Sequence, residues 1–364
     1  MERGSQIYRL VLGDEMMDCY YFECGKDEHE TREKMIKEIE SWIMSPELTD
    51  IVQAFGGIYP NTKNIKELAA WLLEFSDIWD YRHRQKNAKD VKTGEAARWM
   101  VNNDSITEEQ EKTVFKGIDR LGLRGVSDPL FNYYDYIIAL GGARMSCLFR
   151  PRFAKCLLER MDKAPKAVVS LSGMRPVSDT ERAATDIYAP DAQTEFDLIN
   201  AGAEKVFELK HEYMEERYCN PNQNSSWAIR TYSVPRYDFQ ILSVSGPSSD
   251  PETRRANSAD TFAFFAEKQH IKTGSRVLLV TSQIYVPYQQ LEAIRTWAIP
   301  NNVYVETVGF PTEWNTNQQG MMEAANYLQE IRSTIQSVNR YIENIFCKMP
   351  KKDRGDMCIK HKKM

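Results

Sequence analysis

Four short apolar runs constrain the fold of this chain more than any other feature of its sequence. They are YIIALGGAR at 136–144, AVVSLSG at 167–173, RVLLVTS at 276–282 and VYVETVG at 303–309. Runs of this length, rich in Val, Ile and Leu and followed by amphipathic stretches, are typical of parallel strands that helices bury on both faces. We therefore expect an α/β protein whose parallel sheet is flanked by helices.

Each run ends in small or polar residues, and this end is where we expect a ligand. In parallel sheets ligands bind beyond the carboxyl ends of the strands, because the loops there present free backbone N–H groups and helix N-termini. The pattern thus predicts the place of a site without defining its chemistry.

Composition narrows the class of protein. A net charge of −5 over 364 residues provides no global field for polymeric nucleic acid or an anionic membrane. No run approaches the roughly 20 apolar residues of a membrane span, and residues 1–20 lack the apolar core of a signal peptide, so we expect a cytoplasmic protein. The seven cysteines include no C-x-x-C pair, and no His pair has metal-ligand spacing, so we expect neither disulfides nor a metal site.

Two regions differ in their periodicity. Residues 1–130 contain amphipathic helical patterns at 28–44 and 65–79, and a capping-box sequence at Thr107 predicts the start of a third helix. After residue 130, strand and helix patterns alternate, with helices expected at 151–161, 193–201, 253–269, 287–298 and about 318–346, and extended structure at 229–244. We predict a helical N-terminal region, 1–130, and an α/β domain, 131–364, that includes the long C-terminal helix.

The order of motifs resembles the SanA, ElyC and YdcF family of bacterial proteins over about 135–312. The shared features are strands ending in Leu-Gly-Gly and Ser-Gly, a helix opening at SADTF (258–262), and VTSQIYVP at 280–287. The resemblance implies a Rossmann-like domain and a nucleoside-type ligand such as S-adenosylmethionine. This chain departs from the family at Tyr285, where His is usual, at Tyr288, where Arg is usual, and in the helix opening, which lacks the family's Arg, Glu and Asn.

Two of the strand ends combine glycine with a nearby arginine. Gly141-Gly142 is followed by Arg144, and Ser172-Gly173 is followed by Arg175. Such turns occur commonly for structural reasons alone, but glycine admits close approach of a ligand, and guanidinium groups bind phosphate or carboxylate in bidentate fashion. We therefore predict an anion site formed by Gly141, Gly142, Arg144, Ser172, Gly173, Arg175, Thr281 and Ser282.

Three residues are candidates for chemistry at that site. Glu195 opens the predicted helix after the second strand and is the preferred acid, base or metal ligand, although a carboxylate in a first helical turn is often only a cap. Asp260 has the same two interpretations. Tyr285 carries a phenol with an ordinary pKa of about 10, which favours hydrogen bonding or stacking over acid–base work near neutrality.

These features predict an enzyme that acts on a small anionic, nucleotide- or nucleoside-like metabolite by group transfer or hydrolysis. The alternative is a non-catalytic sensor that binds a nucleotide or S-adenosylmethionine. Either function makes a small anion the expected partner, and formation of a homo-oligomer is left open. We expect Gly141, Gly142, Ser172, Gly173, Ser282 and Tyr285 to line one concavity, with Glu195 and Asp260 on its rim.

Overall fold

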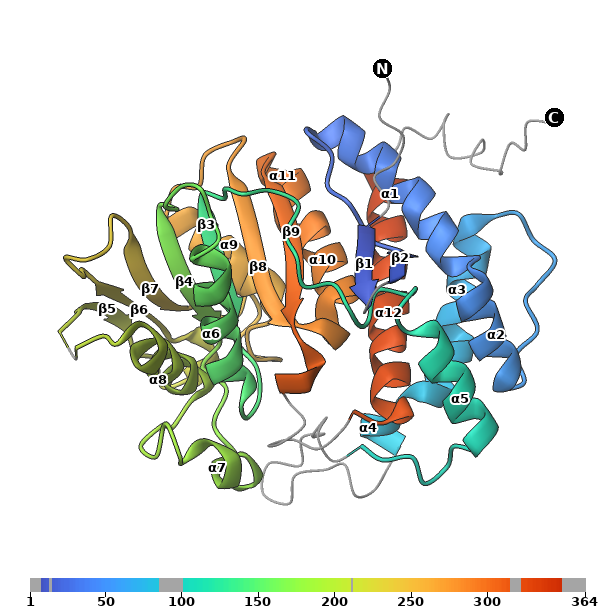
Figure 1. The fold of residues 1–364 in the computed structure, drawn as a ribbon, viewed down its shortest axis with the longest axis horizontal. Coiled ribbons are helices and arrows are strands. Elements are labelled where there is room, and N and C mark those ends of the chain that lie inside the picture. Colours follow the sequence, from blue (N-terminus) through green and yellow to red (C-terminus); the bar gives the residue numbers. More distant parts are fainter. Residues whose placement is uncertain (1–7, 13–14, 85–100, 211, 315–321, 349–364) are drawn as a thin grey trace. The chain divides into compact units, whose positions relative to one another are not determined.

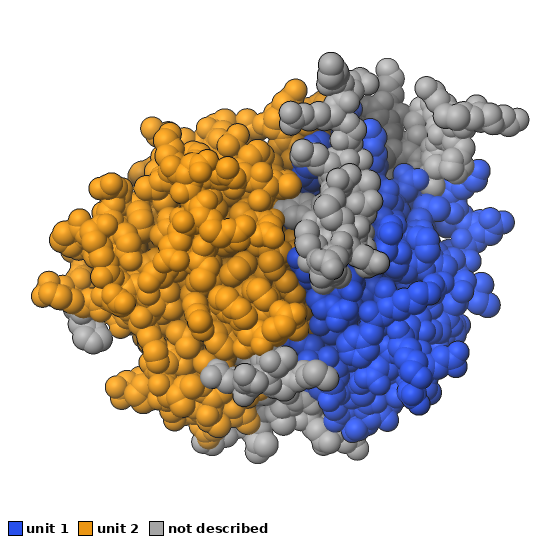
Figure 2. Space-filling model, in the orientation of Figure 1, with its two compact units in different colours: residues 1–23, 33–125, 322–364 blue, residues 24–32, 126–321 orange. Residues whose placement is uncertain are grey.

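The computed structural model describes residues 8–12, 15–84, 101–210, 212–314 and 322–348. The chain divides into two compact units, coloured separately in Figure 2. Unit 1 comprises residues 1–23, 33–125 and 322–364, and unit 2 comprises residues 24–32 and 126–321.

Unit 2 is built on a seven-stranded sheet with the order β5-β6-β7-β4-β3-β8-β9 (Figure 1). The parallel strands are β3 (Tyr136–Leu140), β4 (Ala167–Ser172), β7 (Gln240–Ser245), β8 (Arg276–Ser282) and β9 (Tyr304–Phe310). Antiparallel β6 (Trp227–Tyr232) and β5 (Met214–Tyr218) extend one edge. In chain order the parallel strands run 3-2-1-4-5, the Rossmann order, so the expected Rossmann-like α/β fold is confirmed.

Helices cover both faces of this sheet. On one face α6 (Ser146–Leu158) and α8 (Glu195–Phe207) contribute Phe153, Leu157 and Phe207 to a core that includes Ile137. On the other face α9 (Ser258–Lys268) places Phe265 against the ring of Tyr136, with centroids 5.8 Å apart. Tyr136 and Ile137 are adjacent, so their side chains point to opposite faces of the sheet. A short 3₁₀ turn, η5 (Gln283–Tyr285), then leads from β8 into α10 (Val286–Ala293), which continues as a π-helical turn, η6 (Ile294–Ala298), and a short α11 (Ile299–Asn301).

The packing of α6 on α8 corrects two predicted helix boundaries. Helix α6 begins at Ser146, five residues before the predicted start, and contains Pro151. Proline has no N–H to donate to the carbonyl of Cys147, and Gly202 of α8 packs against that carbonyl. Gly202 therefore does not end its helix as predicted. It allows two helix backbones to approach closely, and α8 continues to Phe207.

Unit 1 contains the hairpin of β1 (Tyr8–Leu12) and β2 (Glu15–Cys19) and a group of helices. The helices are α1 (Glu28–Ile43, of which 33–43 belongs to this unit), α2 (Pro46–Ala54), α3 (Ile65–Phe75), the 3₁₀ turn η1 (Ser76–Trp79), α4 (Tyr81–Arg84), α5 (Glu108–Gly117) and α12 (Ala324–Lys348). The two helices predicted before residue 80 are confirmed. Thr107 caps α5 through the predicted capping box, accepting from Gln110 N at 3.3 Å.

The long C-terminal helix belongs to unit 1, which differs from the predicted boundary of the α/β domain at 131–364. Its apolar stripe packs on the N-terminal helices. The ring of Tyr327 lies 5.9 Å from that of Phe115, and Asn339 Nδ2 donates to the carbonyl of Ala69 at 2.9 Å. An amphipathic helix packs wherever a complementary apolar face exists, and periodicity does not identify that face. The predicted start near 318 lies outside the described residues.

Candidate functional site

The carboxyl ends of β3 and β8 form the switch point of the sheet, where the strand order reverses. Arg150, from α6, joins these two strand ends. Its Nη1 donates to the carbonyl of Leu140 at 2.9 Å and also to that of Gly141, and its Nη2 donates to Ser282 Oγ at 3.2 Å. One guanidinium thus lies directly beneath the place where a ligand of this fold is expected.

Arg150 is a buried charge without a counter-charge. Its residue is 3% exposed, and no carboxylate of the described residues lies within ion-pair distance of it. Nε has no hydrogen-bond partner within the described part of the chain, and the ring of Tyr285 lies 5.6 Å from the guanidinium carbon. Burial lowers the pKa of Arg150. A buried cation that is not paired is costly, so an anion bound here would compensate it.

The turn between β3 and α6 leaves this cation accessible to a small group. A Cβ at position 142 would lie 2.9 Å from Arg150 Nη1 and 3.0 Å from Ser146 Cβ, so only glycine avoids crowding the guanidinium. Helix α6 has neither a side-chain cap nor an acidic residue in its first turn, whereas α8 and α9 both have capping boxes. The N-terminus of a helix carries partial positive charge and free N–H groups, which favour an anion.

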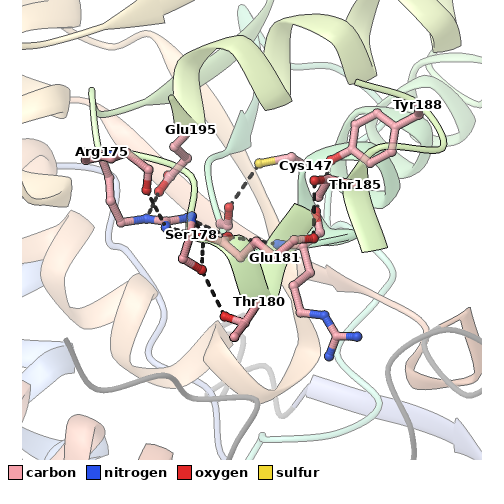
Figure 3. A network of polar contacts seen from close by, with 11 residues as sticks. Cys147, Arg175, Ser178, Thr180, Glu181, Thr185, Tyr188 and Glu195 are labelled. Atoms are coloured by element: carbon pink, nitrogen blue, oxygen red, sulfur yellow. Dashed lines mark hydrogen bonds and ion pairs between the residues drawn. The ribbon is translucent and has the colours of Figure 1, made fainter. Parts of the chain in front are cut away.

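Arg175 is committed to two carboxylates, as Figure 3 shows. Its Nη1 lies 2.5 Å from Glu181 Oε2, and its Nε lies 2.9 Å from Glu195 Oε2. Burial alone would raise the pKa of Glu181, but the hydrogen bonds and charge of Arg175 outweigh burial and lower it. The predicted role of Arg175 as an anion clamp competes with these ion pairs, and Arg150, which the sequence did not single out, holds the available charge.

The same network fixes the turn after β3. Glu181 Oε1 accepts from the backbone N–H of Arg144 at 3.3 Å, and the hydroxyl of Tyr188 donates to the carbonyl of Arg144 at 3.0 Å. Arg144 adopts a left-handed conformation with φ 54°, which costs a non-glycine residue energy and requires such support. Helix α7 (Asp179–Thr185), which carries Glu181, therefore holds the turn in place.

Several predicted residues do meet at this end of the sheet. A Cβ at Gly141 would touch both Glu195 Oε1 and Ser172 Cβ, so these three residues are neighbours. Gly142, Ser282 and Tyr285 all lie around Arg150. Tyr285 follows β8 in the η5 turn, where Gln283 holds the loop by donating to Ser127 Oγ at 2.5 Å and accepting from Thr312 at 2.7 Å.

Other predicted residues lie apart from this cluster. The side chain of Thr281 is buried on the face of β8 opposite Ser282, because successive side chains alternate. Gly173 faces Ala256, 3.8 Å from where its Cβ would be. Asp260 serves its own helix. It forms the capping box of α9 with Asn257 and an ion pair with Arg254 at 2.5 Å.

Two further titratable groups have roles that the structure makes plain. Burial alone would raise the pKa of Asp260, but the Arg254 guanidinium and the backbone N–H of Asn257 lower it to about 2. Burial raises the pKa of the Cys147 thiol to about 12, as expected for a small buried residue rather than a nucleophile. In the described ranges no three His, Cys, Asp or Glu side chains come together as metal ligands would.

Arg150 was missed because its sequence context predicts an ordinary amphipathic helix. It lies in Cys147-Leu-Phe-Arg-Pro151, where the neighbours are apolar, and an arginine there more often extends its charge to solvent. The only available signal was an arginine at a position that shares a helical face with Cys147 and Ala154, both fully buried. Within the described chain, no helix combines the length and the apolar character that crossing a bilayer requires.

Comparison with known proteins identifies relatives of unknown activity. Residues 26–122 match a family model described as the Rv3785 N-terminal domain. The chain is 31% identical over 323 residues to the uncharacterized protein Rv3785 of Mycobacterium tuberculosis and to the uncharacterized protein Mb3814 of Mycobacterium bovis, covering 84% of this chain and 89% of each relative. No solved structure matches the chain significantly. The chain therefore belongs to the family of the mycobacterial protein Rv3785.

Proposed function

We propose that this protein binds a small anionic, nucleotide- or nucleoside-like metabolite at the β3–β8 switch point and acts on it by group transfer or hydrolysis. The observation that carries the proposal is the buried, uncompensated guanidinium of Arg150 beneath the Gly141-Gly142 turn. A phosphate or carboxylate above the turn would supply the missing counter-charge and would accept from the N–H groups at the start of α6.

The charges around the turn favour a single anionic group. Arg144, Arg150 and Arg175 exceed Glu181 and Glu195 by one positive charge, and Arg175 is already bound to both carboxylates. The remaining positive charge is therefore concentrated near Gly142. Beside it, the ring of Tyr285 offers a flat surface of the kind on which a nucleobase stacks. This combination supports a nucleotide or an S-adenosylmethionine-like molecule as the ligand.

Glu195 and Tyr285 are the groups closest to the proposed ligand that could take part in a reaction. Glu195 Oε1 lies against Gly141, while Oε2 is bound by Arg175. An ion-paired carboxylate is a weaker proton acceptor, and this observation favours the second candidate function, a sensor that binds the same ligand without turning it over. Tyr285→Phe keeps the ring and should impair only a step that requires the hydroxyl.

The test begins with the molecule that the protein retains on purification, identified by mass spectrometry. Thermal unfolding is then measured with inorganic phosphate, AMP, ATP and S-adenosylmethionine. A ligand at about 100 times its Kd stabilises a protein by about 2.7 kcal/mol, which thermal unfolding resolves. Conversion of the retained ligand supports the enzyme, and stable retention without conversion supports the sensor.

Two variants locate the binding. Arg150→Lys should weaken the ligand-induced shift because lysine loses the planar fork, whereas Arg160→Lys, at a residue whose side chain is 61% exposed, should leave it unchanged. Circular dichroism checks that Arg150→Lys is folded, and Gly142→Val provides a second way to block the site. Failure of every anion to stabilise the wild-type protein, with no ligand retained, would refute the proposal.

A further inference from the structure

Strand β5 is an edge strand whose five residues are all exposed. It pairs with β6 on one side only, and Figure 1 shows it at the outer edge of the sheet. Met214 is 69% exposed and Tyr218 is 48% exposed, so large apolar side chains stand at both ends of the strand. An open edge with apolar side chains and no proline is able to pair with another strand.

The sequence of β5, Met-Glu-Glu-Arg-Tyr, is complementary to itself in the antiparallel direction. In a register centred on Glu216, Met214 of one copy lies opposite Tyr218 of the other, and Glu215 lies opposite Arg217. Residues directly opposite one another share a face of the sheet, and both pairings are of the stabilising kind. The pattern therefore specifies a second copy of this chain as the partner.

Charged residues on an edge strand commonly prevent pairing, and Glu216 acts in that sense. At the centre of the register it meets Glu216 of the other copy, a like-charge pair that destabilises. Glu215 and Arg217 already contact each other within one chain at 2.9 Å, so pairing between copies exchanges that contact rather than creating a charge pair from free side chains. Both features predict a weak association that depends on protein concentration.

We propose that β5 pairs with β5 of a second copy in the register centred on Glu216, so that the two sheets become one continuous sheet across a two-fold axis. The ends of the strand supply apolar contacts, Glu215 and Arg217 select the register, and the Glu216 pair limits the affinity. The proposal is independent of the ligand at the switch point.

Sedimentation velocity of the full chain across a series of concentrations tests the pairing. We expect a monomer–dimer equilibrium in the wild type. Glu216→Thr should tighten it several-fold because the like-charge pair is removed, and Met214→Lys should weaken it by tenfold or more. Thermal unfolding of each variant at a concentration where the wild type is monomeric verifies that the fold is unchanged.

Charge exchange gives the sharpest test. Arg217→Glu and Glu215→Arg each place like charges opposite one another, so each variant alone should be monomeric. Mixed together they should form a heterodimer, because every 215–217 pairing is again between opposite charges. Since Glu215 also binds Arg230 at 2.9 Å, a mixture of Glu216→Thr/Arg217→Glu with the wild type provides a second comparison that leaves Glu215 intact. It should associate less than Glu216→Thr with itself. A wild type that stays monomeric at every concentration, or a dimer that none of these changes affects, would overturn the proposal.

Discussion

Replacing Arg175 by Met should destabilise the protein strongly, because Arg175 neutralises two carboxylates. Glu181 is 0% exposed and Glu195 is 15% exposed at the side chain. Removing one partner of a buried ion pair costs about 3 to 5 kcal/mol, since the remaining charge is left without compensation. The backbone N–H groups of Ser178 and Arg144 still donate to Glu181, at 3.2 and 3.3 Å, so we expect a loss near the lower end of that range.

The loss should depend on pH with a defined sign. Arg175 holds the pKa of Glu181 below its ordinary value, so in the wild type this carboxylate stabilises the fold above the unfolded pKa of about 4.3, and that stabilisation is lost as the pH falls through the lower folded pKa. Without Arg175, burial should raise the pKa of Glu181. The difference between variant and wild type should therefore widen as the pH rises from about 4 to 7 and narrow in acid.

Urea unfolding at several pH values measures both effects. The matched control is Arg160→Met, which removes an ion pair to Asp128 between side chains that are 61% and 75% exposed and should cost at most about 1 kcal/mol. If Arg175→Met is no more destabilising than this control, or if its effect grows in acid, the ion-pair network does not support the turn as we argue.

Three further predictions follow from single side chains. Gly142→Val should weaken ligand binding by crowding Arg150 Nη1, 2.9 Å from the new Cβ, whereas Gly173→Ala, with its nearest neighbour at 3.8 Å, should be tolerated; calorimetric titration that finds equal losses would contradict this. Asp260→Asn should lower stability at pH 7 by about 1 kcal/mol, and the deficit should disappear as the pH falls through about 2, where wild-type Asp260 protonates; a deficit unchanged by acid would count against the Arg254 pair. Iodoacetamide at pH 8 should modify exposed Cys219 and spare Cys147, whose thiol pKa is about 12, and peptide mass spectrometry showing rapid labelling of Cys147 would disprove its burial.

Local signals in the sequence determined the main elements of the fold. Runs of Val, Ile and Leu predicted β3, β4, β8 and β9 within a few residues, because a strand buried on both faces must be apolar along its whole length. The Thr107 capping box predicted the start of α5, because the first N–H groups of a helix require acceptors close in sequence. The strand-end glycines predicted the place of the candidate site for a similar reason, since a close approach of backbone excludes a side chain.

Only the tertiary structure decided which side chains face one another. The exposed edge strand β5, MEERY, has no apolar alternation and was not predicted, and the C-terminal helix packs in unit 1 because its complementary apolar face is there. Arg175 was expected to bind an anion but pairs with Glu181 and Glu195, six and twenty residues away. Arg150 meets the end of β8, 132 residues later, because the strand order reverses at β3. Charge compensation depends on distance in space, and the sequence records only distance along the chain.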